Sequence, residues 1–415
     1  MCWQKCNGEI RAGCWQSANS SRTKRPPRFD VAVRTSNNLS ERRLTFVQRI
    51  WQLNWGLVLL IVITALIGFA TLYSISGGST ETWVSRQLIR FGVGFTLMLI
   101  VAAVDIRFWL RAAFLIYGVA LALLVAVEVV GTVGMGAQRW VDLGPFQLQP
   151  SEVMKIALVL ALARYFHGIA HEDVAQSRRL VVPTLMVIIP VVLVLRQPDL
   201  GTALLLLIGA VSMFFLAGVR LWIFGAAIMA AVAAVPFAWH YLHDYQRERI
   251  LIFLSPERDP LGAGYHILQS KIALGSGGVF GKGFLQGTQS HLNFLPEIQT
   301  DFIFTMLAEE LGLVGALGLL ALYVVMLIYA IAIALRSRNQ FGRLLAMGIA
   351  ATFFVYFFIN IAMVTGLVPV VGVPLPLVSY GGTAMVTILV GFGLVMSVYI
   401  HRDVRLPRRA QTEEL

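Results

Sequence analysis

The sequence predicts an all-α polytopic membrane protein, and three observations support that fold class. Of the 415 residues, 57% are hydrophobic and only 13% are charged. The apolar residues form long uninterrupted runs, and about 20 consecutive apolar residues suffice for a helix that crosses a bilayer. Basic residues gather in alternate connections between these runs. Such a chain is expected to be held together by helix packing within lipid.

Ten runs have the composition of a membrane-spanning helix. They cover roughly residues 53–75, 86–104, 112–130, 152–166, 181–195, 201–218, 222–239, 302–335, 345–366 and 384–400. Of the 33 basic residues, 23 lie in the two terminal segments or in the alternate connections that share their side. Because basic residues stay on the cytoplasmic side, both termini are predicted to be cytoplasmic. The net charge of +11 follows from this topology, and nucleic-acid binding is the weaker explanation.

Composition divides the chain into three regions: a tail at residues 1–50, a membrane domain at residues 51–402 and a short cytoplasmic tail at residues 403–415. The first tail is rich in Ser, Asn, Arg and Pro, which predicts disorder or an extension from an early start codon. It lacks the apolar stretch of a cleaved signal peptide. All three cysteines lie in this tail, so no disulfide framework is expected in the exported loops.

A connection of about 60 residues, at about 240–300, separates the seventh and eighth runs on the predicted outer face. Loops longer than about 15 residues are usually functional or disordered, and the aromatic residues spread through this one argue against disorder. Its stretch SGGVFGKGF resembles a phosphate-binding loop. However, Ser276 stands where the first glycine is required and Gly283 follows Lys282, so the nucleotide motif is absent. Outward-facing basic residues still favour an anionic ligand such as a phosphate or diphosphate.

Asp259 lies within this loop, before Pro260 and close to Gly262 and Gly264. These neighbours predict that its carboxylate is displayed on a tight turn. The alternative is a simple Asp-Pro turn, in which the carboxylate only accepts hydrogen bonds from the backbone.

Two further junctions place ionisable residues at the outer helix ends. In QPSEVMK, Ser151 is a predicted N-cap, and Glu152 and Lys155 share a face of the first turn. A local ion pair that anchors the helix is the alternative to a substrate-binding pair. The stretch LRQPDLGTA brings Arg196 and Asp199 to the same side of the membrane.

A third junction, LPEIQTDFIFTMLAEELG, begins the eighth run. Thr300 is a predicted N-cap, and Asp301, Thr305 and Glu309 follow at helical spacing. Glu309 and Glu310 reach toward the apolar region. Two adjacent carboxylates there are costly unless they face protein or water, which favours a functional interpretation.

Several long motifs, in order along the chain, resemble the SEDS family (shape, elongation, division and sporulation). They are AQRWVDLGPFQLQPSE, QPDLGTA, QRERILIFLSPERDPLGAGYHILQSKIALGSGGVFGKGFLQGTQS and PLPLVSYGGT. The resemblance runs from about Trp55 to Arg402, and GYHILQS and GKGFLQGTQS are closer to the elongation members than to the division members. The chain departs from the family in its long first tail and at Ala384, where the family commonly has Ser.

The resemblance implies a peptidoglycan glycosyltransferase in the cytoplasmic (inner) membrane, with a role in cell elongation and rod shape. Such enzymes polymerise lipid II into β-1,4 glycan strands on the outer face and release undecaprenyl diphosphate. The implied partners are lipid II, the nascent strand, a class B penicillin-binding protein with transpeptidase activity, and other membrane proteins of the elongation complex. No organic cofactor is expected, and a divalent cation, Mg²⁺ or Mn²⁺, stays open.

The resemblance also assigns roles to residues. Asp259 matches the family's essential loop aspartate, which implies a general base or a group that orients the acceptor and a metal. Residues expected to bind substrate are Arg139, Trp140, Glu152, Lys155, Lys271, Glu297 and Asp301. Residues expected to support the cavity are Arg196, Asp199, Glu309, Glu310, Gly381 and Gly382.

Two other classes of protein remain as alternatives. A flippase or transporter of lipid-linked precursors should carry ionisable residues near mid-membrane, on broken helices in repeated halves. Here those residues crowd the outer ends, and no clear internal repeat is seen. A non-catalytic scaffold of the elongation complex would have little need for Asp259 beside its basic neighbours. The enzyme is therefore the favoured hypothesis.

Overall fold

The computed structural model describes residues 46–81, 83–134, 137–142, 147–169, 177–241, 247–248, 251–253, 255, 263–288 and 297–406. The predicted tail at residues 1–50 and the cysteines in it thus lie almost entirely outside the described residues. Its disorder stays a prediction, as does the cytoplasmic position of both termini.

A helix forms at each of the ten predicted runs. These helices are α2 (Trp55–Ile75), α3 (Val84–Ala103), α4 (Ile106–Val130), α5 (Pro150–His167), α6 (Ser177–Arg196), α7 (Leu200–Ala217), α8 (Leu221–Tyr241), α12 (Ile303–Arg336), α13 (Gln340–Val364) and α14 (Gly382–Ile400). Two shorter helices are α1 (Phe46–Trp51) and α10 (Ala263–Ser276). The predicted all-α class is therefore confirmed.

Within the described residues, eight helices are long and apolar enough to cross a membrane: all of the ten above except α5 and α8. In α8 only the shorter stretch Leu221–Ala234 qualifies as apolar. Helix α5 carries Glu152, Lys155 and Arg164 within its 18 residues. Glu152 and Lys155 are buried by other helices, so these two charges face protein rather than lipid. The chain is a multi-pass membrane protein, and the number of ten spans stays a prediction.

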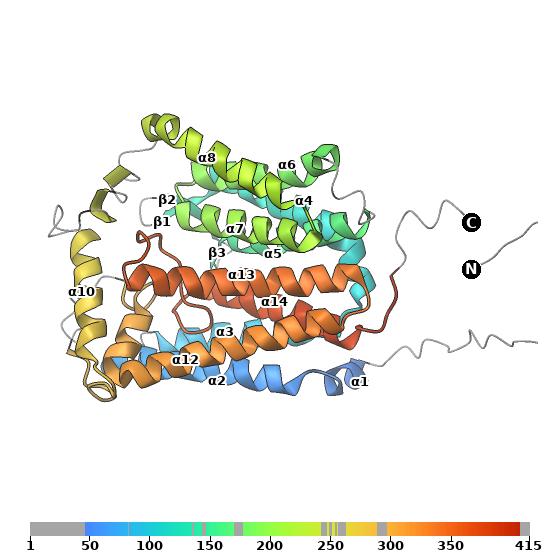
Figure 1. Ribbon diagram of the computed structural model, residues 1–415. Coiled ribbons are helices and arrows are strands. Elements are labelled where there is room, and N and C mark those ends of the chain that lie inside the picture. Colours follow the sequence, from blue (N-terminus) through green and yellow to red (C-terminus); the bar gives the residue numbers. More distant parts are fainter. Residues whose placement is uncertain are drawn as a thin grey trace, which may run out of the picture. The chain divides into compact units, whose positions relative to one another are not determined.

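Helices α5, α13 and α14 form the interior of the bundle. Figure 1 shows α13 between the group of α2, α3 and α12 and the group of α4 to α8. Small residues allow the closest helix pair, α3 and α14, to approach: a Cβ added at Gly94 would lie 2.7 Å from the Leu389 side chain, and one at Gly393 would lie 2.7 Å from the Met98 carbonyl oxygen. Close packing at small residues is the usual way in which helices associate in lipid.

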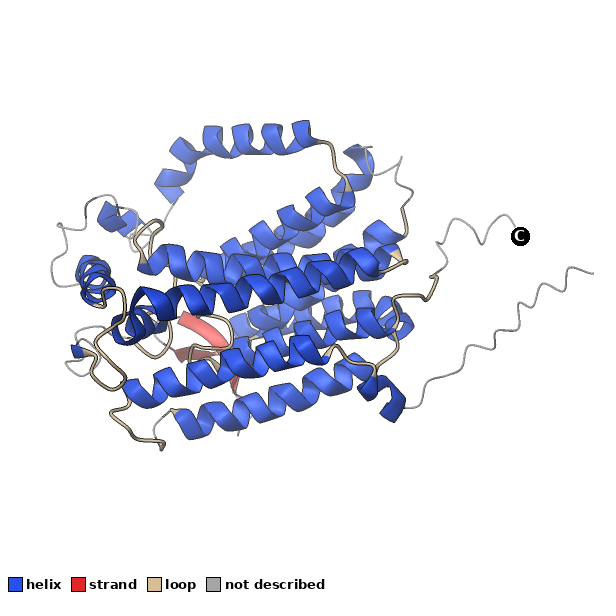
Figure 2. Ribbon diagram, turned by 60° about the horizontal axis from the view of Figure 1, so that its bottom comes forward, coloured by secondary structure: helices blue, strands red, loops and turns tan. Residues whose placement is uncertain are grey.

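One end of the bundle carries the irregular structure. Three short strands, β1 (Thr132–Gly134), β2 (Ala137–Asp142) and β3 (Gln147–Leu148), pair antiparallel in the order β1-β2-β3. They are the small red element among the helices in Figure 2. The strands and α10 lie at the same end, which we call the loop end, opposite the end where the described chain begins and finishes (Figure 1).

Candidate functional site at the loop end

The predicted catalytic residue, Asp259, lies outside the described residues, and its role stays a prediction. Every other predicted site residue is described. They lie at the loop end, on or directly beside β2 and helices α5, α6, α7, α10, α12 and α14.

Glu152 and Lys155 form a closed buried cluster with Tyr356 of α13. Only 3% of each of the two charged residues is exposed, and 1% of Tyr356. Lys155 Nζ lies 2.5 Å from Glu152 Oε1, and the Tyr356 hydroxyl donates to Glu152 Oε2 over 2.6 Å. Lys155 Nζ also donates to the Tyr356 hydroxyl oxygen. Both oxygens of the carboxylate are therefore used by protein partners, which leaves Glu152 unsuited to act as a base in this conformation.

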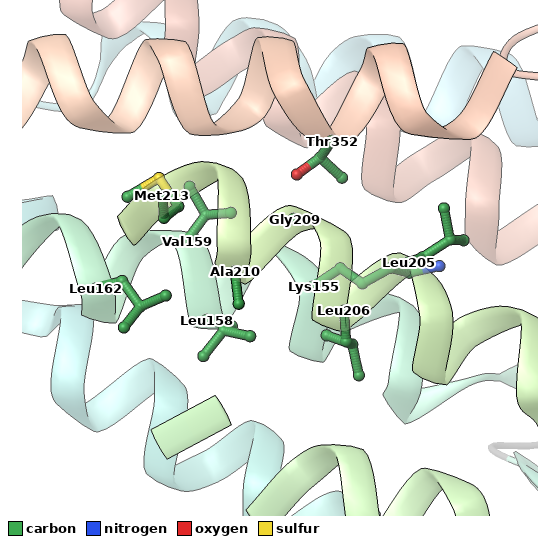
Figure 3. Close-up of a pocket in the computed structure, with 10 residues that line it drawn as sticks. All are labelled: Lys155, Leu158, Val159, Leu162, Leu205, Leu206, Gly209, Ala210, Met213 and Thr352. Atoms are coloured by element: carbon green, nitrogen blue, oxygen red, sulfur yellow. The ribbon is translucent and has the colours of Figure 1, made fainter. Parts of the chain in front are cut away.

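Two small cavities lie beside the Lys155 side chain. One, of about 10 Å³, lies between α5 and α7 and is drawn in Figure 3 with Lys155 stretched along its wall. The other, of about 20 Å³, lies between α5, α13 and α14, and Thr352 lines both. Each is close to the volume of one water molecule and has mostly apolar walls. Neither can hold a sugar or a diphosphate.

Asp199 caps the first turn of α7. Its carboxylate accepts hydrogen bonds from the Thr202 N–H (3.1 Å) and hydroxyl (2.9 Å), and Gln149 Nε2 donates to it over 3.3 Å. Arg139, on β2, places Nη1 4.0 Å from Asp199 Oδ2 and donates to two backbone carbonyls of the preceding turn. Asp199 is thus an N-cap of α7, and its role in supporting a cavity stays a prediction, while 31% of the Arg139 side chain is exposed.

Asp301 and Thr305 are held by different neighbours at the start of α12. Asn360 Nδ2 of α13 donates to the Asp301 carbonyl over 2.9 Å. The hydroxyl of Ser270, on α10, lies 2.9 Å from the hydroxyl of Thr305, and both residues are fully buried. Asp301 is partly exposed. Asp301 therefore lies at the rim of the bundle, with a backbone fixed from the interior.

Glu309 and Glu310 continue inward along α12 and are buried, with 0% and 2% exposed. Glu309 Oε1 accepts from Lys282 Nζ (2.6 Å) and from the Thr288 N–H (3.1 Å) and hydroxyl (2.9 Å). Ser74 of α2 donates to Glu310 over 2.5 Å. These two carboxylates fasten the loop and α2 to α12, and their role in supporting a cavity stays a prediction.

The glycine-rich segment at residues 277–288 packs its backbone against a kink in α12. The kink is at Gly312, with φ 68° and ψ −164°, and four backbone hydrogen bonds of 3.0 to 3.2 Å join the segment to α12 on both sides of it. A Cβ at Gly281 would collide with the Glu310 carbonyl, and one at Gly312 would collide with the Gly281 nitrogen. These glycines allow two backbones to touch. The segment that resembles a phosphate-binding loop is therefore a packing element.

Two predicted N-caps are wrong. The cap of α5 is Gln149, with a proline as the first helical residue, and Ser151 is buried inside the first turn. The cap of α12 is Phe302, and the Thr300 hydroxyl instead donates to the carbonyl and the carboxylate of Glu297 within the preceding turn. For α5, the helix begins at Pro150, one residue before the predicted cap. For α12, Glu297 already accepts the hydrogen bond of the Thr300 hydroxyl.

Gly381 and Gly382 begin α14, Gly381 as its N-cap. A Cβ at Gly382 would lie 3.0 Å from Arg90 Nε, and the Arg90 guanidinium stacks over the Tyr380 ring with 4.6 Å to its centroid. The preceding Ser379 donates to the Thr300 carbonyl over 2.5 Å. The segment before α14 thus packs against the turn that carries Asp301.

The remaining predicted residues lie around this rim. Lys271, on α10, is exposed, and its Nζ approaches the backbone of Gly366. Trp140 on β2 and Glu297 are partly exposed, and Arg196 is exposed at the end of α6. Among the described residues, no three His, Cys, Asp or Glu side chains are grouped so that they could hold a metal ion.

Comparison with known proteins gives consistent matches. The family described as cell cycle protein, FtsW/RodA/SpoVE, matches residues 46–404. The peptidoglycan glycosyltransferase MrdB of Escherichia coli is 45% identical over 348 residues, which cover 83% of this chain and 93% of MrdB.

Two solved structures share the fold. One chain of a peptidoglycan synthase complex, described as coordinating polymerization and crosslinking, superposes with a TM-score of 0.75 and 35% identity, over 84% of this chain and 98% of that one. The rod-shape-determining protein RodA of Thermus thermophilus gives a TM-score of 0.64 and 31% identity, over 84% of this chain and 97% of that one.

Proposed function

This chain belongs to the FtsW/RodA/SpoVE family of cell cycle proteins, and from that premise we propose that it is a peptidoglycan glycosyltransferase. The observation that carries the proposal is its 45% identity to a peptidoglycan glycosyltransferase over nearly all of that relative's length. The substrate in this proposal is lipid II, the product is a β-1,4 glycan strand, and the leaving group is undecaprenyl diphosphate. The site of the reaction is the loop end, on the outer face of the cytoplasmic membrane.

The reaction requires two kinds of group from the protein. The 4-hydroxyl of the acceptor GlcNAc attacks the anomeric carbon of MurNAc with inversion, so its proton must pass to a base as the new C–O bond forms. The bond from the anomeric carbon to the diphosphate breaks at the same time, and positive charge must stabilise the departing anion. A carboxylate and a cation with access to the surface are therefore needed at the loop end.

Asp259 is the proposed base, or the group that orients the acceptor and a divalent cation, on the ground of the family resemblance. Among the described residues, Glu152, Glu309 and Glu310 are buried and engaged by protein partners. Asp301 is partly exposed at the rim, and we propose that it binds substrate.

Two basic residues at the loop end could face the diphosphate. Arg139 keeps 31% of its side chain exposed, and Lys271 is exposed on α10. By contrast, Lys155 and Lys282 are each bound to a carboxylate. A divalent cation would supply the same stabilisation if Asp259 binds one, and titration with EDTA followed by added Mg²⁺ or Mn²⁺ tests that part.

The experiment supplies lipid II to the purified protein together with a class B penicillin-binding protein, its proposed partner, whose transpeptidase site is blocked. Glycan strands are resolved by gel electrophoresis. A general base typically contributes 10²–10⁴-fold in rate, so Asp259→Ala should lower polymerisation by at least about 100-fold. Asp403→Ala is the matched control, because Asp403 is exposed and pairs with Arg338 at the opposite end.

Each outcome has a distinct meaning. Absence of glycan with the wild-type pair would overturn the proposed function, and translocation of labelled lipid II without polymer would favour a flippase. Unchanged polymerisation with Asp259→Ala would overturn the assignment of the base, and loss of polymer with Asp301→Ala alone would transfer that role to Asp301. Fractionation of inner and outer membranes tests the proposed localisation.

A further inference from the structure

The glycine-rich segment at residues 277–288 exposes apolar side chains at the loop end. Phe280 is 84% exposed, and Val279, Phe284 and Leu285 are also exposed. Figure 1 shows this stretch of chain directly after α10, where it turns beside α12. A group of large apolar side chains on the surface marks a contact with another protein or with a membrane.

This apolar surface continues the lipid-facing side of α12. Val314, Leu317 and Ile328 are exposed, and their spacing places them on one side of this membrane-spanning helix. The Val314 N–H donates to the Val279 carbonyl over 3.2 Å. Val279 therefore lies at the loop end of the side that α12 turns toward lipid.

The other end of the segment contacts α2. The Phe284 ring stacks on the Tyr73 ring with 6.5 Å between centroids, and the Leu285 N–H donates to the Ser74 hydroxyl oxygen over 3.1 Å. Leu66, two turns earlier on the same side of α2 as Tyr73, is exposed. The segment thus joins the lipid-facing sides of two membrane-spanning helices.

The depth of the segment follows from the length of α12. Arg336 is the last residue of this helix and is exposed at the opposite end of the bundle. About 22 residues of helix, a rise of about 33 Å, separate Val314 from Arg336. The hydrocarbon core of a bilayer is about 30 Å thick. With Arg336 at one boundary of that core, Val314 and the segment beside it lie at the other, where acyl chains meet headgroups.

The polar groups of the segment are compatible with this position. Non-helical backbone at membrane depth must find its hydrogen bonds within the protein. Backbone N–H groups donate to protein acceptors at Gly281, Lys282, Gly283, Leu285, Gln286 and Thr288. Lys282 is the one charged residue of the segment, and its Nζ lies 2.6 Å from Glu309 Oε1 and 2.7 Å from the Thr288 hydroxyl. The segment therefore brings no unpaired charge to the membrane boundary.

We propose that residues 277–288 form a membrane anchor, in which Val279, Phe280, Phe284 and Leu285 insert among the acyl chains of the leaflet that surrounds the loop end. The anchor holds the docked segment, and with it the Lys282–Glu309 pair, at a fixed depth beside the Gly312 kink. Insertion of the segment does not depend on any catalytic activity, so it is tested separately from the proposed function.

The test measures the depth of position 280 by electron paramagnetic resonance. In the full chain, Cys2, Cys6 and Cys14 are replaced by Ser, and Phe280→Cys carries a nitroxide label. The protein is reconstituted in phospholipid vesicles. Oxygen concentrates among acyl chains and a nickel chelate stays in water, so the ratio of their collisions with the label reports immersion. We expect oxygen to prevail at position 280.

Leu317→Cys and Glu81→Cys are the matched controls. Leu317 lies on the lipid-facing side of α12, and Glu81 is exposed in the connection between α2 and α3 at the loop end. Oxygen should prevail at Leu317 and the nickel chelate at Glu81, with Phe280 resembling Leu317. Size-exclusion chromatography reports folding of each variant, and Val279→Cys provides a second position in the segment if Phe280→Cys does not fold.

Three outcomes would overturn the anchor. Collisions dominated by the nickel chelate in the segment, as at Glu81, would place its apolar surface in water. If the label is then shielded from both reagents only when the class B penicillin-binding protein is added, the surface binds a protein instead of lipid. Shielding from both reagents in the protein alone would show that another part of the chain covers the segment. The polymerisation assay decides the proposed function in every one of these cases.

Discussion

Two regions of the loop end bury a carboxylate beside a lysine, and they do so in different ways. In the first, Glu152 and Lys155 lie three residues apart on α5, and Tyr356 closes the group. In the second, Glu309 on α12 pairs with Lys282, which lies 27 residues away in the glycine-rich segment. The side chains of Glu152 and Lys155 are 5% and 2% exposed, whereas Lys282 is 28% exposed beside a Glu309 that is fully buried.

The two regions differ in which part of the chain must fold before the charge of the buried carboxylate is neutralised. The α5 pair is formed by one helical turn, so it exists whenever α5 is helical. The α12 pair exists only when the segment at residues 277–288 is docked on the Gly312 kink. Docking of that segment and neutralisation of Glu309 are therefore one event. We expect substitutions in the first region to act on the whole bundle and those in the second to act mainly on the loop.

The largest effect should come from Lys155→Met, which leaves the buried Glu152 without its cation. Removing one partner of a buried ion pair costs about 3–5 kcal/mol. The free energy of unfolding, measured by SDS titration in mixed micelles, should fall by this amount. The double variant Glu152→Gln/Lys155→Met is the control and should recover most of it. A single variant as stable as wild type would show that the pair is not needed for the bundle.

Gly312→Ala should have the next largest effect, through the second region. The conformation at Gly312 is one that only glycine adopts readily, and such strain costs about 1–3 kcal/mol. A Cβ would also collide with the Gly281 backbone. We expect a loss of at least about 2 kcal/mol in the same titration. Gly318→Ala, on the same helix with open space around it, should be neutral; equal losses in both would argue against the backbone clamp.

The same contrast explains what the sequence could predict. Helical runs, the i, i+3 spacing of Glu152 and Lys155, and the i, i+4 spacing of Thr305 and Glu309 are local patterns, and the structure confirms them, whereas Asp301 lies in the turn before α12. The family resemblance drawn from the motifs is confirmed as well.

The residues that the sequence missed act over long separations. Tyr356 is a single hydroxyl among phenylalanines, 204 positions from Glu152, and Asn360 is 59 positions from Asp301. No spacing rule connects such residues, because their contact depends on how α13 packs. The glycines near Lys282 predicted a close approach of backbone, but whether to a ligand or to another helix depends on the fold.

Tyr356→Phe tests how much of the first region depends on the third residue. The substitution removes the hydroxyl that donates to Glu152 Oε2 and keeps the ring, whose face lies 4.3 Å from Lys155 Nζ. A buried acceptor left without its donor costs about 1–3 kcal/mol, and the remaining Lys155 contact favours the low end of that range. We expect about 1 to 2 kcal/mol. Tyr323, on α12, donates a hydrogen bond to the neutral Pro376 carbonyl. Tyr323→Phe therefore gives the comparison for a hydroxyl without a charged partner.

Of these substitutions, Lys282→Met should lower the global free energy of unfolding least, and its effect should be the most confined to one segment. Glu309 keeps the Thr288 N–H and hydroxyl, and water can reach the partly exposed position that the ammonium leaves, so the expected loss is about 1 kcal/mol. The change should appear instead as faster hydrogen exchange confined to residues 277–288 and the adjoining turn of α12. Lys271→Met, at an exposed lysine of the same end, serves as the control and should leave exchange in that segment unchanged. If Lys282→Met lowers the global free energy as much as Lys155→Met does, the two regions neutralise their carboxylates equivalently and the contrast between a permanent pair and a docking-dependent one is wrong.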